Sequence, residues 1–254
     1  MTDAHCHVSG GDPSVREFLI GRDFIGVHPW ACQGQSMALE CSRFLSDLRA
    51  ALEADTRLGI GEIGLDRLKD RNISPQMREL FEAQLRLAFE FGRPVVLHGA
   101  KCWGQVVKTV STFEHSNIPN IRTFPSILFH GFSRSDGLIP DIVALGGFIS
   151  VGPAVLNDHA VNYRALVKKI PLDRLLLETD RTPENAAECP SIREVAVKVA
   201  ELRGLPLSEL ESLTDQNAAR FSSIAILENS RGTSPQRIRG TVPKESKNEH
   251  RFVS

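Results

Sequence analysis

His5 and His7 lie close to the start of the sequence and are separated only by Cys6. Side chains alternate between the two faces of a β-strand, so a strand here would direct both imidazoles to one face and Cys6 to the other. Imidazole nitrogens are common ligands of divalent metals, and two rings on one face can share an ion. Alone, the His-x-His pattern is weak evidence for a metal site.

Four more potential ligands each lie at or just beyond the end of an apolar run, and these are Glu62, His98, His130 and Asp180. In a barrel of parallel strands the carboxyl ends converge on one mouth, which is where the active sites of that fold are found. Four histidines and two carboxylates at one mouth would be a costly polar cluster unless they bound a cation. The sequence therefore predicts a metal centre made of these six residues.

The elements that would position the centre follow from the hydrophobic pattern, in which short apolar runs alternate with longer amphipathic stretches. Seven strands are predicted, at 2–5, 24–28, 58–63, 94–98, 126–130, 147–151 and 174–178. Helices are predicted at 36–54, 74–91, 103–113, 135–145, 159–168 and 190–203, with a last helix from about residue 215. An α/β chain of 254 residues suits a TIM-type (β/α) barrel, although that fold has eight strands.

Composition limits the class of protein and the kinds of partner. The net charge is −1, so a polyanionic substrate would be held by a local patch or by bound cations rather than by a global field. Five cysteines without a C-x-x-C pair favour a reducing compartment, and no apolar run is long enough to span a membrane. We expect a cytoplasmic protein with no membrane contact and no obligate protein partner.

Two regions are distinguished along the chain: a barrel domain at 1–229 and a basic tail at 230–254. The tail holds six basic and two acidic residues, a net charge of +4 (6 minus 2), and few apolar ones. Such a segment cannot bury enough apolar surface to offset its ordering entropy, so we expect a disordered extension. The alternative is an arm that binds nucleic acid.

Six segments, in order, resemble the motifs of the TatD family of metal-dependent deoxyribonucleases. They are DAHCH at 3–7, GVHPW at 26–30, GIGEIGLD at 59–66, RPVVLH at 93–98, FHGFS at 129–133 and LETD at 177–180. The resemblance runs from residue 3 to about 221 and implies a barrel of the metal-dependent hydrolase kind with two divalent ions, Mg, Mn or Zn. It implies that His5, His7, Glu62 and Asp180 hold one ion and that Glu62 bridges to a second ion held with His98 and His130.

Two cations that share a carboxylate can activate a water and clamp a phosphodiester, so Glu62 and Asp180 are the predicted catalytic residues. Asp180 is the candidate for orienting and deprotonating the attacking water. Asp66 is expected to orient a ligand histidine. Three residues are candidates for substrate binding, with a structural or solvated role as the alternative for each: His28, Lys101 and Arg134.

One part of the sequence departs from the family pattern. Only the 18 residues 8–25 separate His7 from the GVHPW segment, which is room for one crossover but not for two and a strand between them. We therefore expect one βα unit near the N-terminus to be missing. Residues 16–20 suit the start of a helix better than a strand, although 15–25 could supply an irregular replacement.

The predicted function is hydrolysis of phosphodiesters by a two-metal-activated water, as in a deoxyribonuclease or phosphodiesterase acting on DNA or on a small phosphodiester. Two alternatives stay open. The same metal cage could open an amide, ester or lactone, since one fold can serve many substrates. The chain could also be a non-catalytic scaffold derived from such an enzyme.

Overall fold

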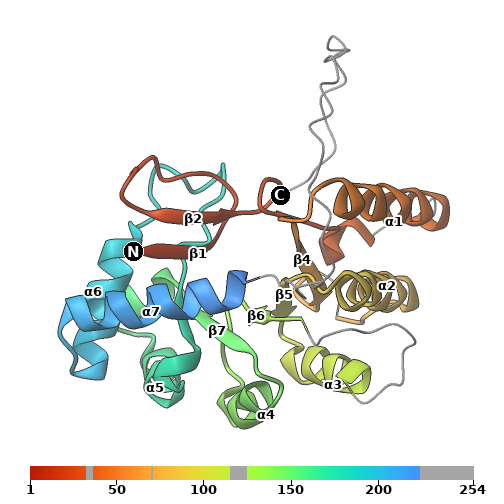
Figure 1. Ribbon diagram of the computed structural model, residues 1–254. Coiled ribbons are helices and arrows are strands. Elements are labelled where there is room, and N and C mark those ends of the chain that lie inside the picture. Colours follow the sequence, from red (N-terminus) through yellow and green to blue (C-terminus); the bar gives the residue numbers. More distant parts are fainter. Residues whose placement is uncertain (33–36, 70, 115–124, 224–254) are drawn as a thin grey trace, which may run out of the picture.

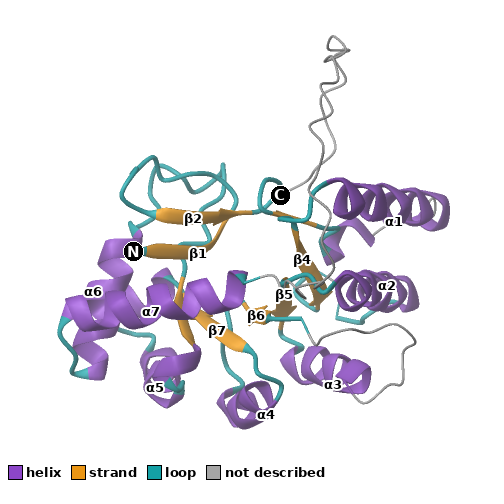
Figure 2. Cartoon of the chain, in the orientation of Figure 1, coloured by secondary structure: helices purple, strands orange, loops and turns teal. Residues whose placement is uncertain are grey.

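A computed structural model describes residues 1–32, 37–69, 71–114 and 125–223. Strands and helices alternate over most of the chain, as Figures 1 and 2 show. The described residues form eight strands: β1 (Thr2–Cys6), β2 (Arg16–Leu19), β3 (Phe24–Ile25), β4 (Gly59–Asp66), β5 (Val95–Ala100), β6 (Ile127–Phe129), β7 (Phe148–Val151) and β8 (Leu175–Leu177). The predicted α/β barrel class is confirmed, with one more strand than the sequence predicted.

Seven α-helices surround these strands within the described residues: α1 (Met37–Ala54), α2 (Pro75–Phe91), α3 (Trp103–Glu114), α4 (Ile139–Ala144), α5 (Val161–Lys169), α6 (Ile192–Arg203) and α7 (Leu207–Ser222). Their ends follow local chemistry. Ser74 caps the first turn of α2, and Gly92 ends that helix in the left-handed conformation. Ser191 and Glu194 form a reciprocal capping box at the start of α6.

All the strand pairs are parallel, but the ladder does not run around the whole barrel. Strands β3 to β8 form one sheet in sequence order, and β1 and β2 form a second sheet of two strands. One seam is spanned by a bridge between Ile20 and Phe24, the other by a hydrogen bond from the Asp180 N–H to the His5 carbonyl (3.0 Å). The strand ladder is therefore not closed, and isolated contacts span its two seams.

The predicted loss of one βα unit is confirmed for its helix but was wrong for its strand, because β2 is present. The strand is present over part of the segment that we expected to favour a helix. What the described residues lack are the helices that would follow β1 and β2, because only residues 7–15 and 20–23 connect these strands. Parallel neighbours normally need a crossover of about a dozen residues or more. The loop here is compact, with Gly11 at φ 78°, and the flank beside β1 and β2 carries loops (Figure 2).

Helix α7 closes the barrel at the amino ends of its strands. Phe221 lies fully buried, with its ring stacked on that of Phe24 (5.7 Å between centroids) and at 6.0 Å from Phe18 and Phe148. Asn217 fixes the helix to the start of β8 by donating to the Leu175 carbonyl (2.7 Å). This apolar plug leaves the carboxyl ends of the strands as the open mouth.

Two other expectations concern the end of the chain and membranes. The last helix begins at Leu207, eight residues before the predicted start, so that boundary was wrong. The predicted tail at 230–254 lies outside the described residues, as does 224–229 of the predicted domain. No helix in the described part is long and apolar enough to cross a membrane.

Candidate metal centre

Glu62 stands at the middle of the site, on β4, with its side chain 4% exposed. Its two oxygens face different groups of imidazoles. Oε1 lies 2.6 Å from His98 Nδ1 and 2.5 Å from His130 Nε2, and Oε2 lies 3.6 Å from His5 Nε2 and 3.5 Å from His7 Nε2. This one carboxylate therefore joins two halves of a polar cluster.

The first half of the cluster comes from the two ends of the barrel sequence. His5 and His7 lie at the end of β1, and Asp180 follows β8. Asp180 Oδ1 is 3.5 Å from His5 Nε2 and 3.6 Å from His7 Nε2. These pairs are too long for strong hydrogen bonds. Ligands of one ion with bonds of about 2.1 Å would stand roughly 3.0–3.4 Å apart, close to the observed spacing.

The second half is held by hydrogen bonds to carboxylates. His98 Nε2 lies 2.7 Å from Asp66 Oδ2, while Nδ1 of the same ring faces Glu62. This places Asp66 in position to orient the His98 ring, and that role stays a prediction. His130 Nδ1 lies 3.7 Å from Glu178 Oε2. His28 also enters this half, with Nε2 at 3.6 Å from Glu62 Oε1 and its ring edge-on to His98.

Two opposing effects set the pKa values in the cluster: burial disfavours the charged form of each group, and pairing with an opposite charge favours it. Burial raises the pKa of Glu62, but the charge and hydrogen bonding of His130 outweigh it and hold that pKa well below its ordinary value. Burial likewise opposes the charged form of His130, yet Glu62 and Glu178 raise its pKa well above the usual range. Loss of solvent around Asp180 raises the pKa of its carboxyl group, but the nearby imidazoles of His5 and His7 outweigh this and hold the pKa below its ordinary value. The carboxylates are thus ionised at neutral pH.

An independent observation indicates that these residues fit a bound metal. Several buried imidazole nitrogens have no hydrogen-bond partner in the described structure, namely Nδ1 and Nε2 of His5, Nδ1 of His7 and Nδ1 of His130. A buried polar atom without a partner is costly, and ligation would remove that cost for a nitrogen facing the ion. The potential ligand atoms form three groups, and within each group all of them lie within 4.8 Å of one another. The groups are His5 with His130 and Asp180, His5 with His7 and Glu62, and His28 with Glu62 and His98.

All six predicted metal ligands therefore come together, and His28 lies among them rather than at the rim. Lys101 and Arg134 do not join the cluster. Lys101 directly follows β5, and Arg134 lies in the loop after β6. Both side chains are exposed, with φ of 56° and 57°, and within the described ranges neither makes a hydrogen bond or ion pair with the cluster. Their role in substrate binding stays a prediction.

Two buried carboxylates at the site were missed from the sequence. Glu178 accepts hydrogen bonds from the Gly131 N–H (2.7 Å) and Ser150 Oγ (2.5 Å) beneath His130. Asp3 accepts from Thr179 through both the backbone N–H (3.0 Å) and Oγ1 (2.6 Å), and burial raises its pKa to about 7. In the sequence, the only indication of either residue was its position: each is an acidic residue in a predicted strand, two residues before a predicted ligand.

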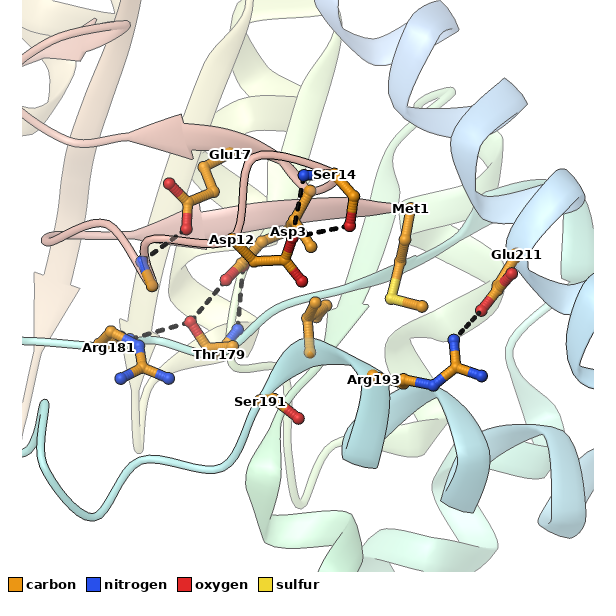
Figure 3. Close-up of a pocket in the computed structure, with 13 residues that line it drawn as sticks. Met1, Asp3, Asp12, Ser14, Glu17, Thr179, Arg181, Ser191, Arg193 and Glu211 are labelled. Atoms are coloured by element: carbon orange, nitrogen blue, oxygen red, sulfur yellow. Dashed lines mark hydrogen bonds and ion pairs between the residues drawn. The ribbon is translucent and has the colours of Figure 1, made fainter.

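A cavity of ≈ 290 Å³ opens between the β1–β2 region and the start of α6. Figure 3 shows Asp12 of the β1–β2 loop and Glu17 of β2 on the side of Thr179 and Arg181, with Ser191 and Arg193 of the α6 region on the opposite wall. None of the six predicted ligands is among its described lining residues. It occupies space beside β1 and β2 and is separate from the set of ligand atoms.

A parallel (β/α) barrel with histidines and carboxylates gathered at the carboxyl ends of its strands defines a hydrolase of the metal-dependent barrel class. Within that class, a sequence model described as TatD related DNase matches residues 21–223. The chain belongs to the TatD related DNase family. His5 and His7 lie before the matched residues, in the part where the barrel departs from the usual connections.

Similarity to individual proteins supports this family assignment. The chain is 29% identical over 207 residues to the uncharacterized metal-dependent hydrolase YabD of Bacillus subtilis, covering 79% of this chain and 76% of that one. It is 31% identical over 186 residues to the 3'-5' ssDNA/RNA exonuclease TatD of Cronobacter sakazakii, covering 68% of each. The solved structure of YjjV, a TatD homologue from Escherichia coli K12, superposes with a TM-score of 0.63 at 26% identity, covering 83% of this chain and 78% of that one.

Proposed function

We propose that this chain is a two-metal phosphodiesterase that cleaves nucleotides from single-stranded nucleic acid. The position of Glu62 carries the proposal, because its two oxygens face two separate sets of imidazoles. A carboxylate so placed suits a bridge between two ions. The nuclease names of relatives such as TatD of Cronobacter sakazakii support a phosphodiester as the substrate.

Two divalent cations would lower the pKa of a water and stabilise charge on the phosphate oxygens. His5, His7, Glu62 and Asp180 would hold one of them, and Glu62 with His98 and His130 the other. The protein supplies fixed ligand orientation: Asp66 sets the His98 ring, and Glu178 lies beneath His130. The site is therefore supported by a second set of carboxylates that do not face the ions.

Asp180 is the proposed proton acceptor. Its side chain is 49% exposed while Oδ1 faces His5 and His7, so it is the one carboxylate of the centre open to the mouth. Its lowered pKa keeps it ionised and able to accept a hydrogen bond from the attacking water. Its partly open position lets a proton pass on to solvent.

The test is hydrolysis of 5'-labelled single-stranded DNA with Mg²⁺, Mn²⁺ or Zn²⁺ added, and with a chelator as the control. We expect chelator-sensitive shortening of the strand. Asp180→Asn should keep much of the bound metal and lose about 10²-fold or more in rate, the scale for loss of a general base. Wild-type protein that retains its metal but cleaves no phosphodiester would contradict the proposal and favour an amide, ester or lactone substrate.

A further inference from the structure

Few large apolar side chains are exposed in the described structure, and two of them lie beside the metal centre. Trp30 is 39% exposed and Leu68 is 53% exposed, whereas the chain's second tryptophan, Trp103, is 4% exposed in the core. Trp30 follows the GVHP segment and Leu68 follows β4. Packing in the core does not explain an indole that is exposed at the mouth of a site.

Trp30 is fixed to the metal centre by two contacts. Its ring lies edge-on to His28 with 4.8 Å between centroids, and its backbone N–H donates to His28 Nδ1 (3.1 Å). The indole is thereby placed with its centroid 6.4 Å from that of His98. A sugar could span the gap between a base on the indole and a phosphate at the centre.

The surroundings of Trp30 carry positive charge. Lys69 Nζ lies 3.7 Å from the centroid of the indole ring. Strands β4 and β5 end together, with Asp66 paired to Ala100, and three exposed cations follow these two ends: Arg67, Lys69 and Lys101. An aromatic ring combined with cations is the arrangement by which proteins bind single strands, because every base has a face to stack and every link has a phosphate.

We infer that Trp30 is a stacking surface for a base of single-stranded nucleic acid, with Arg67, Lys69 and Lys101 attracting the phosphates beyond it. The inference rests on the proposed function, which it deepens by naming a residue that positions the substrate. Trp30 donates no ligand to the metal centre. It sets which link of the strand lies at Glu62 and favours substrates that carry bases.

The experiment uses two labelled probes of equal length, an oligothymidylate and an abasic strand, both with phosphorothioate links that resist cleavage. Binding is measured by fluorescence anisotropy with Mg²⁺ present. Trp30→Ala should weaken oligothymidylate binding about 5- to 150-fold, the effect of about 1–3 kcal/mol per stacked base. The abasic probe should lose much less, so the preference for bases should collapse. Trp30→Phe should keep most of that preference.

Two further variants separate stacking from general damage. Trp30→Leu keeps apolar bulk without a π-face and should behave like alanine. Val197→Ala removes an exposed apolar side chain (48% exposed) from α6 and should change neither affinity. Quenching of wild-type tryptophan fluorescence by oligothymidylate should disappear in Trp30→Phe, because Trp103 is buried.

Equal weakening of both probes in Trp30→Ala, or no weakening of either, would overturn the inference. Failure of the proposed function gives a different result. In that case wild-type protein with Mn²⁺ or Mg²⁺ would cleave neither strand made with ordinary phosphodiester links, whatever its affinity for bases.

Discussion

Replacing Asp66 with asparagine should weaken metal binding and destabilise the metal-free protein by comparable amounts. Asp66 is 1% exposed, and its Oδ2 lies 2.7 Å from His98 Nε2. The opposite ring nitrogen, Nδ1, faces Glu62 at 2.6 Å. The asparagine keeps the shape and can still accept the Leu68 N–H, which bonds Asp66 Oδ1 (2.5 Å), but it removes the charge that orients the imidazole.

The magnitude follows from the pKa of Asp66. Burial opposes its charged form, but the hydrogen bond and charge of His98 lower its pKa from 3.8 to about 2. At roughly 1.4 kcal/mol per unit, this difference corresponds to about 2 kcal/mol of free energy of unfolding near pH 7. The thermal midpoint of a domain this size should fall by about 4–8 °C. Loss of a carboxylate that orients a metal-bound histidine typically costs about 10- to 100-fold in metal affinity, a similar free energy.

The pH dependence gives the prediction its sign. A carboxylate whose pKa is lower in the folded state stabilises that state above its unfolded pKa, and this contribution is lost as pH falls through the folded pKa. The stability difference between wild type and Asp66→Asn should thus shrink as pH falls from about 4 toward 2, and it should also shrink as pH rises through the raised pKa of His98. Urea unfolding with chelator present measures it, and metal titration by calorimetry gives the affinity. Wild-type metal affinity in the variant would refute the orienting role, and a stability difference that grows in acid would refute its electrostatic origin.

Further changes test other parts of the molecule. Glu62→Gln should remove the proposed bridge, so elemental analysis should find fewer than two ions per chain; two retained ions would show that Glu62 does not bridge. Phe221→Ala should lower the free energy of unfolding by about 3–5 kcal/mol, because it empties the plug between Phe24 and Phe148, and a loss below 1 kcal/mol in urea unfolding would contradict that packing. Gly64→Ala should fail to yield soluble protein, since its Cβ would meet the His98 carbonyl oxygen at 2.0 Å, and normal expression would show that β4 and β5 can separate there.

The strands that carry Glu62, His98 and His130 could be predicted because their signal is local. Each is an apolar run with a ligand side chain in its carboxyl-terminal part or just beyond it, and parallel strands bring such parts together without further information. The structure extends β4 to Asp66 and β5 to Ala100, beyond their predicted ends. Strand β2 had no such signal. Residues 16–19 pair with β1 at positions such as Thr2 with Arg16. The loop that joins these two strands is shorter than the usual crossover between parallel neighbours. Tertiary contact with β1, rather than local sequence, makes residues 16–19 a strand instead of a helix.

Two of the supporting carboxylates, Asp3 and Glu178, could not be predicted for the same reason. The segment Glu178-Thr179-Asp180 offers two acids at the end of a strand, and spacing alone does not say which faces the ions. Glu178 is directed beneath His130 by Ser150 and Gly131, which lie 28 and 47 residues away in the chain. The start of α7 was misplaced because Pro206, rather than a Ser, Thr, Asp or Asn cap, precedes its first residue.

The joining of the first and last parts of the barrel at one seam has a consequence for how the protein is made. His7 donates its backbone N–H to the carbonyl of Arg181 (2.8 Å), and Asp3 bonds Thr179, 176 residues away. At about 5–20 residues per second, a ribosome needs roughly 9–35 s to travel from His7 to Asp180. During that interval, the first two histidines have been synthesised without the aspartate that completes their half of the site. Folding of the centre must therefore follow translation of most of the chain, and metal capture should come last.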